Sequence, residues 1–284
     1  MPYSGLADCL TLSANWGWIA PMEIIADAKT AAQNAIKFDS ELAEAHTSLA
    51  GVALLLEWDW QQVEEEFKRA IDLNSRYAFA HHVYGFYLLF MKRYEEAIAQ
   101  WDQVLKLDPI VPFYQAAAGL PYYYMHQYDK AIDQYQKALE LEPNFHAAHY
   151  YLGCAYIDKK MYQDATEEIE KAIEFLGPSP DYLGALSLAY SLAGRKSDAL
   201  KVLGKLQELE KNGFVSFIAF ATAYMGLDDR ERAIEYFQKS FESHDFPSLP
   251  EAMGSKMFDS LRNDPRFQEI SRKMNLPQKP QVKP

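Results

Sequence analysis

The chain has 284 residues, of which 49% are hydrophobic and 24% are charged, and its formal net charge is −12. This composition can bury a large core and excludes a disordered chain. The negative charge disfavours nucleic acid and anionic membrane surfaces as direct partners. No stretch reaches the roughly 18–20 uninterrupted apolar residues that a membrane-spanning helix needs.

The N-terminal segment Met1–Gly5 has neither the basic nor the apolar region of a secretory signal, which favours a cytoplasmic protein. A periplasmic location is the alternative if the chain is part of a larger membrane-anchored protein. The two cysteines, Cys9 and Cys154, lie far apart in the sequence. We expect two reduced thiols, because a bridge between them would have to span several repeats.

A pattern of small and large residues recurs along the whole chain. A small residue, usually alanine, is followed four positions later by a residue that is usually large, and three positions further on by another small or medium-sized one. The first position holds Ala28, Val63, Ala97, Ala131, Ala165, Ala199 and Ala233. The second holds Ala32, Phe67, Trp101, Tyr135, Ile169, Leu203 and Phe237, and the third Ala35, Ala70, Val104, Ala138, Ala172, Leu206 and Ser240. The steps are 35 residues once and then 34 residues five times, a period typical of stacked helical hairpins.

A second small residue precedes the first position of six of the seven units, by thirteen residues before Val63 and by twelve in the others. These residues are Ala50, Gly85, Gly119, Gly153, Ser187 and Ala221. In a helical hairpin, the closest crossing admits only a small side chain on each helix. The pattern therefore predicts two antiparallel helices per unit, joined by short turns, and no competing strand pattern is present.

With these positions the sequence resembles tetratricopeptide repeat proteins over residues 1–245, with repeats that end near residues 40, 75, 109, 143, 177, 211 and 245. The resemblance implies an all-α, right-handed solenoid of about seven helix-turn-helix repeats that binds other proteins. The segments Tyr3–Cys9, Ala43–His46, Trp58–Trp60 and Phe258–Phe267 also resemble a bacterial module found at the C-terminus of larger regulators. That resemblance implies a regulatory or sensory module excised from a transcription regulator or signalling protein.

The two ends depart from the period. Repeat one has about nine extra residues, and we expect Trp16 and Trp18 to fold over its open end. Residues 246–277 are predicted to form a linker and a capping helix, with Asp264 as the N-cap. Phe267, Ile270 and Met274 should cover the last repeat, and residues 278–284 should form a flexible tail.

Repeat two contains the segment Trp58-Asp59-Trp60-Gln61-Gln62. Asp59 followed by Gln62 three residues later is a capping-box pattern, which predicts that a helix begins here. We expect both tryptophans to pack between repeats one and two.

Candidate catalytic and metal-binding groups are explained by the repeat. His46, His81 and His149 occupy the same position of their repeats, which favours packing over a metal site. The paired carboxylates Glu64–Glu66, Glu95–Glu96 and Glu167–Glu168 should face solvent on second helices, with basic residues three or four positions on. Phosphate-binding loops and nucleophile motifs are absent. We predict no enzyme, no cofactor and no metal.

The strongest functional signal is an aromatic face on the first helices of repeats three to five. Positions 2, 5, 9 and 12 of each repeat share one helix face that should line a concave groove. The predicted partner-binding residues are Phe79, His82, Phe86, Phe113, Leu120, Tyr123, Tyr124 and Tyr150. Such an exposed apolar patch usually marks a binding site; the alternative is burial against neighbouring helices. Pro121, inside one of these helices, should kink it, which either tilts the tyrosines into the groove or is a tolerated defect.

We therefore predict a non-catalytic scaffold that binds a peptide or helix of a partner protein. The Lys, Asn and Arg residues of a carboxylate-binding clamp are missing from this face, so apolar anchors suit it better. Residues 1–245 carry a net charge of −15, since the last 39 residues hold seven Lys/Arg and four Asp/Glu. An acidic body is compatible with a basic partner, although solubility alone would explain its sign. The oligomeric state stays open.

Overall fold

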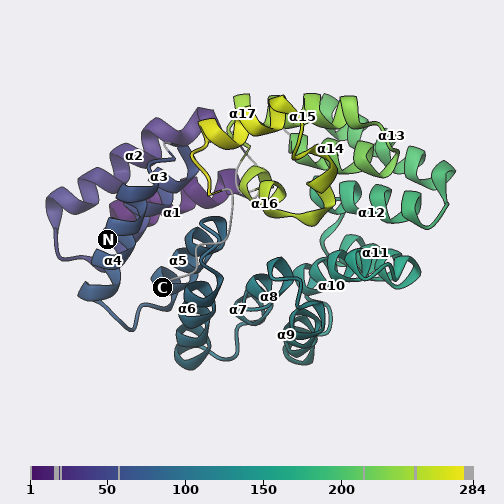
Figure 1. Ribbon diagram of the computed structural model, residues 1–284. Coiled ribbons are helices and arrows are strands. Elements are labelled where there is room, and N and C mark those ends of the chain that lie inside the picture. Colours follow the sequence, from purple (N-terminus) through teal and green to yellow (C-terminus); the bar gives the residue numbers. More distant parts are fainter. Residues whose placement is uncertain are drawn as a thin grey trace. The chain divides into compact units, whose positions relative to one another are not determined.

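The computed structural model describes residues 2–15, 19, 21–56, 58–213, 215–245 and 248–277 (Figure 1). Every regular element in these ranges is a helix, which confirms the all-α prediction. Contacts divide the chain into two compact units, described separately below: residues 1–109 with 273–284, and residues 110–272. The period alone does not mark this boundary.

Unit 1 contains three helical hairpins and the end of the chain. The hairpins are α1 (Pro2–Asn15) with α2 (Pro21–Phe38), α3 (Ala43–Leu56) with α4 (Trp60–Leu73), and α5 (Ala78–Phe90) with α6 (Tyr94–Leu107).

Unit 2 contains four hairpins and a C-terminal extension. The hairpins are α7 (Pro112–Ala117) and α8 (Leu120–Tyr124) with α9 (Tyr128–Leu141), α10 (His146–Asp158) with α11 (Tyr162–Leu176), α12 (Pro180–Leu192) with α13 (Lys196–Asn212), and α14 (Phe217–Gly226) with α15 (Arg230–Glu242). The extension comprises α16 (Ser248–Gly254), the 3₁₀-helix η1 (Lys256–Leu261) and α17 (Pro265–Lys273).

The periodic positions form the core, as predicted. Nearly all first, second and third positions of the pattern are at most 3% exposed; Leu203 is the exception, at 6%. Large rings such as Trp101, Tyr135 and Phe237 fill the space between hairpins, where burial of each stabilises the fold by about 1.5–3 kcal/mol.

The turn between the two helices of a hairpin is also periodic. Lys92, His126, Lys160, Gly194 and Asp228 all have positive φ and follow one another at 34-residue steps. The next residue then donates its N–H to a carbonyl five residues back, as Arg93 does to Leu88 over 2.9 Å. This geometry satisfies free carbonyls at the end of the first helix. Trp58, another 34 residues before Lys92, has positive φ as well, and only Gly194 among these six positions is glycine.

The three histidines of equal register have a shared packing role. His46 Nδ1 lies 2.6 Å from Glu66 Oε2 and its Nε2 lies 3.0 Å from the Ser40 carbonyl. The rings of His81 and His149 make the same pair of contacts, to a side chain of the second helix and to a loop carbonyl. Each ring therefore fastens the second helix of its hairpin to the loop before the first.

The ends of the chain are described in part. Met274, which is fully buried, accepts a 2.7 Å hydrogen bond from Trp60 Nε1 through its carbonyl. Trp60 also lies against Tyr87 of α5, so it contacts repeat three; its packing against repeat one stays a prediction. Phe267 contacts Phe237 of α15 in the last hairpin; that the segment caps the array stays a prediction. Trp16, Trp18 and residues 278–284 lie outside the described residues.

Two N-terminal caps follow the sequence signals. Asp59 accepts a hydrogen bond from the Gln62 N–H at 3.2 Å, which confirms that α4 begins there. Asp264 accepts from the Arg266 N–H at 2.8 Å, with Pro265 as the first residue of α17.

Pro121 divides the first helix of its hairpin into α7 and α8. Proline has no N–H to offer to the carbonyl four residues earlier, at Ala117, and α7 ends at that residue. The second piece starts again at Leu120 and carries three consecutive tyrosines, residues 122–124.

The small residues lie at the closest helix crossings. A Cβ atom added to Gly119 would lie 2.4 Å from the Tyr135 ring, and one added to Gly153 would lie 2.4 Å from Ile169 Cγ1. Where this position is serine, the Ser187 hydroxyl donates to the Ala199 carbonyl across the crossing at 3.1 Å. The steric reason given for the pattern is therefore observed.

Two glycines with opposite surroundings test this constraint. We expect Gly153→Ala to lower the free energy of unfolding by about 1–3 kcal/mol, because Ile169 has to move. Gly204→Ala should raise it by about 0.5–1 kcal/mol, because nothing lies within 4 Å of the added atom in the middle of α13. Chemical denaturation of both variants measures the difference; effects of equal sign would contradict the crossing argument.

Candidate functional site

The predicted partner-binding residues of unit 1 form an aromatic cluster on α5. His82 is only 3% exposed and accepts a 3.2 Å hydrogen bond from Trp101 Nε1 through its Nδ1 atom. Its ring lies between those of Phe79 and Phe86, with centroid distances of 6.3 and 5.1 Å. Burial lowers the pKa of His82 to about 3, so the ring is neutral at physiological pH. Phe79 and Phe86 are half-buried and keep accessible surface.

The predicted residues of unit 2 lie on α7, α8 and α10. Leu120 and Tyr123 are buried, at 5% and 9% exposure, whereas Phe113, Tyr124 and Tyr150 are half-buried. The buried pair supports this surface from within, and the half-buried rings present area to it. A binding role for any of the eight residues stays a prediction.

Side chains from α8, α10 and α12 form a surface that we call the tyrosine face, defined by the half-buried Tyr124, Tyr150, Cys154 and Asp181 and the buried Tyr182. The rings of Tyr150 and Tyr182 are stacked, with centroids 4.6 Å apart. The Tyr182 hydroxyl lies 2.7 Å from His146 Nδ1. Burial raises the pKa of the Cys154 thiol to about 12, so this thiol is protonated and unreactive.

Acidic groups adjoin the tyrosine face. Burial, followed by the charge of Asp245, raises the pKa of Asp181 to about 7, although a hydrogen bond from Ser216 opposes the shift. Asp245 is 3% exposed and accepts hydrogen bonds from the Ser216 and Ser240 hydroxyls at 2.9 and 3.1 Å. Burial also raises the pKa of Asp158, against a hydrogen bond from Tyr123.

The C-terminal extension covers part of the tyrosine face. Tyr124 Oη donates a 3.3 Å hydrogen bond to the backbone carbonyl of Glu251 in α16. A Cβ atom added to Gly254 would lie 3.1 Å from the Tyr124 ring, so only glycine fits there without a shift. The Glu251 carboxyl is half-buried, and burial followed by the charge of Asp181 raises its pKa to about 8.

Sequence reasoning missed this contact. Glu251 and Asp181 were not among the predicted site residues, and 127 residues separate Tyr124 from Glu251. The only local signal is that Leu249, Ala252 and Met253 supply a short apolar run after the last hairpin, and all three are at most 5% exposed.

The raised pKa values predict that the cover of the tyrosine face loosens with pH. A carboxyl whose folded-state pKa lies above its unfolded value contributes stability at low pH, and this contribution is lost as the pH rises through the folded pKa. For Glu251 the loss falls between its ordinary value of 4.5 and about 8. Hydrogen exchange of residues 248–261, corrected for the intrinsic rate, should be faster at pH 9 than at pH 6.

Glu251→Gln is the control for this prediction. It keeps the shape of the side chain but cannot ionise, so the pH dependence should weaken, and adding Asp181→Asn should remove most of what is left. An unchanged pH profile in the double variant would assign the effect to other groups.

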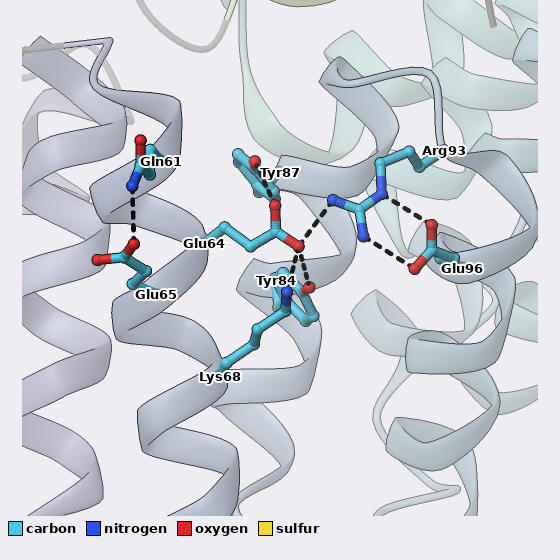
Figure 2. A network of polar contacts seen from close by, with 8 residues as sticks. All are labelled: Gln61, Glu64, Glu65, Lys68, Tyr84, Tyr87, Arg93 and Glu96. Atoms are coloured by element: carbon cyan, nitrogen blue, oxygen red, sulfur yellow. Dashed lines mark hydrogen bonds and ion pairs between the residues drawn. The ribbon is translucent and has the colours of Figure 1, made fainter. Parts of the chain in front are cut away.

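The predicted solvent-facing carboxylates proved to be structural in part. Figure 2 shows Glu64 of α4 between Tyr84 and Tyr87 of α5, Arg93 and Lys68. Arg93 Nη1 lies 2.8 Å from Glu64 Oε1, and Arg93 Nε lies 2.8 Å from Glu96 Oε1. Burial would raise the pKa of Glu64, but hydrogen bonds from Lys68 and Arg93 outweigh it and lower the pKa to about 2.

The expectation of solvent exposure was therefore wrong for Glu64. It was also wrong for Glu66 and Glu168, which hold His46 and His149. The sequence pattern could not reveal these partners, because each lies 19–29 residues away, on the neighbouring helix or at its end.

Glu64→Ala should cost about 2–3 kcal/mol of unfolding free energy, because it leaves Arg93 and two tyrosine hydroxyls without their shared acceptor. The adjacent exposed Glu65→Ala is the matched control and should change stability by about 0.5 kcal/mol or less. Urea denaturation measures both; equal effects would show that the network contributes no net stability.

Within the described part of the chain, no three His, Cys, Asp or Glu side chains are arranged to hold a metal ion. The search for helices long and apolar enough to span a membrane also found none among the described residues. Both cysteines are free.

Comparison with known proteins identifies the repeats. A family model described as TPR repeat matches residues 119–160, and one described as tetratricopeptide repeat matches residues 146–175 and 216–243. The chain therefore contains tetratricopeptide repeats. No curated protein matches it.

Two solved structures are similar along most of the chain. The structure from the functional characterisation of Pseudomonas aeruginosa PilF is 18% identical, covers 96% of this chain and 98% of that chain, and has a TM-score of 0.52. PilW, described as a widely conserved type IV pilus biogenesis factor, is 17% identical, covers 88% and 98%, and has a TM-score of 0.53. At such identities the likeness shows the fold alone.

Proposed function

We propose that this array of tetratricopeptide repeats is a non-catalytic scaffold that binds a peptide or helix of a partner protein through the aromatic faces of its first helices. The observation that carries the proposal is the tyrosine face, where half-buried rings adjoin acidic groups. Rings of this kind supply contact area at small entropic cost, which is why they dominate binding hot spots.

The eight predicted residues divide into two roles under this proposal. Phe79, Phe86, Phe113, Tyr124 and Tyr150 keep accessible surface and contact the partner. His82, Leu120 and Tyr123 are buried and hold those rings in place. Apolar anchors on the partner suit both groups, since no Lys, Asn or Arg residue replaces a ring at the eight positions.

The acidic groups give the proposal its electrostatic part. Asp158, Asp181 and Asp245 lie beside or behind the tyrosine face, and the groups that shift the pKa of Asp181, which are Asp245 and Ser216, include no base. A basic residue among the partner's apolar anchors would complement these carboxyl groups. The regulatory-module alternative rests on resemblance alone and stays a prediction.

The test uses two double variants in capture experiments from native lysate. Phe113→Ala with Tyr124→Ala removes two half-buried rings of unit 2, and partner capture should fall by about a hundredfold or more if both act as hot spots. Helical content should not change, because neither ring belongs to the fully buried core; circular dichroism checks this.

The matched control is Leu141→Ala with Leu200→Ala. These side chains are 45% and 51% exposed and belong to second helices, so capture should persist. If the ring variant retains its partner, or if both double variants lose it equally, the binding site lies elsewhere and the proposal fails.

A further inference from the structure

The α16 segment is a ligand-like element of the chain itself. It is a seven-residue helix that meets the tyrosine face through the hydrogen bond from Tyr124 and also contacts α14 and α15. The following 3₁₀-helix continues this packing, since Phe258 meets Phe237 edge-on at 4.7 Å. A helix laid on an aromatic surface with apolar anchors is one of the common modes of peptide recognition.

One residue of this helix, Glu251, places an acidic group among other acidic groups. Glu251 brings a carboxyl to a surface that already holds acidic groups, and the charge of Asp181 acts against its ionisation. The groups that sense the Glu251 charge are Tyr135, Tyr150, Tyr151 and Cys154, none of which is a base. Of the bases on the extension, Lys256 acts on Asp158, and Arg262 donates to the Met253 and Ser255 carbonyls at 3.0 and 3.1 Å.

The remaining contacts of α16 do fit. Leu249, Ala252 and Met253 are at most 5% exposed, and Gly254 allows close approach to the Tyr124 ring. The segment therefore matches the surface in shape and apolar character and mismatches it at one position, Glu251, where burial and the charge of Asp181 hold the carboxyl in its neutral form. A ligand with the same shape and a positive charge at that position would bind more tightly.

We propose that α16 is an intramolecular stand-in for the partner, and that the partner is an amphipathic helix with apolar anchors, a small residue opposite Tyr124, and a lysine or arginine in place of Glu251. The inference rests on the proposed function and names the chemistry of its ligand. Binding then requires displacement of α16, so only a partner that binds the face more tightly than α16 can occupy it. A weakly matched peptide does not open the face.

The first test strengthens the cover in the full-length chain. Glu251→Lys should slow hydrogen exchange of residues 248–261 about tenfold, because the new ammonium group faces Asp181. In the Asp181→Asn background the same substitution should lose most of this effect. Equal or faster exchange in Glu251→Lys than in the native chain overturns the charge argument.

The second test opens the cover and adds a peptide. Gly254→Trp forces α16 away from Tyr124, and alkylation of Cys154 relative to the exposed Cys9 reports the opening. A labelled peptide of residues 248–261 carrying Glu251→Lys should bind this variant about tenfold more tightly than the native-sequence peptide. Fluorescence anisotropy measures both dissociation constants.

The outcomes separate the two proposals. If the two peptides bind equally, or neither binds the opened chain, the stand-in inference fails, while loss of lysate capture in the Phe113→Ala, Tyr124→Ala variant still supports the scaffold. If capture persists in that variant, the scaffold proposal fails whatever the peptides do. Unchanged Cys154 alkylation in Gly254→Trp shows that α16 does not cover the face and also overturns the inference.

Discussion

Everything in this chain depends on how closely two helices of a hairpin approach. A Gly, Ala or Ser side chain on the first helix and an alanine on the second leave room for one large ring or branched side chain beside the crossing, such as Tyr135 beside Gly119. Because this contact recurs every 34 residues, the first helices repeat the same orientation within each unit. The positions that form the aromatic faces are set by this registration.

The hairpins, their core and their caps could be predicted because the responsible interactions are local. The crossing residues lie twelve positions apart, and the caps of α4 and α17 need only three or four residues. The cover of the tyrosine face could not be predicted in this way, because Tyr124 meets Glu251 127 residues later. The same limit applies to Glu64, which acts through Tyr84 and Arg93 at distances of 20 and 29 residues.

The acidic balance of the chain has two different origins in the structure. At Glu64, neighbouring cations and hydroxyls compensate the charge, and the carboxylate holds adjacent hairpins together. Burial keeps Asp181 and Glu251 closer to their neutral forms, and so do the charges of neighbouring carboxylates, Asp245 for Asp181 and Asp181 for Glu251. The arrangement around Glu64 is typical of a structural network. Carboxyls with raised pKa values, such as Asp181 and Glu251, are more often found at binding or catalytic sites.

The residues in the hairpin turns are not the ones that would give the highest free energy of unfolding. Five of the six equivalent turn residues, Trp58, Lys92, His126, Lys160 and Asp228, have a side chain in a left-handed conformation that costs about 1 kcal/mol relative to glycine. The sequence thus keeps these bends at a small energetic disadvantage at regular intervals. An engineer seeking a more heat-resistant array has a set of evenly spaced sites to change, away from the helix crossings.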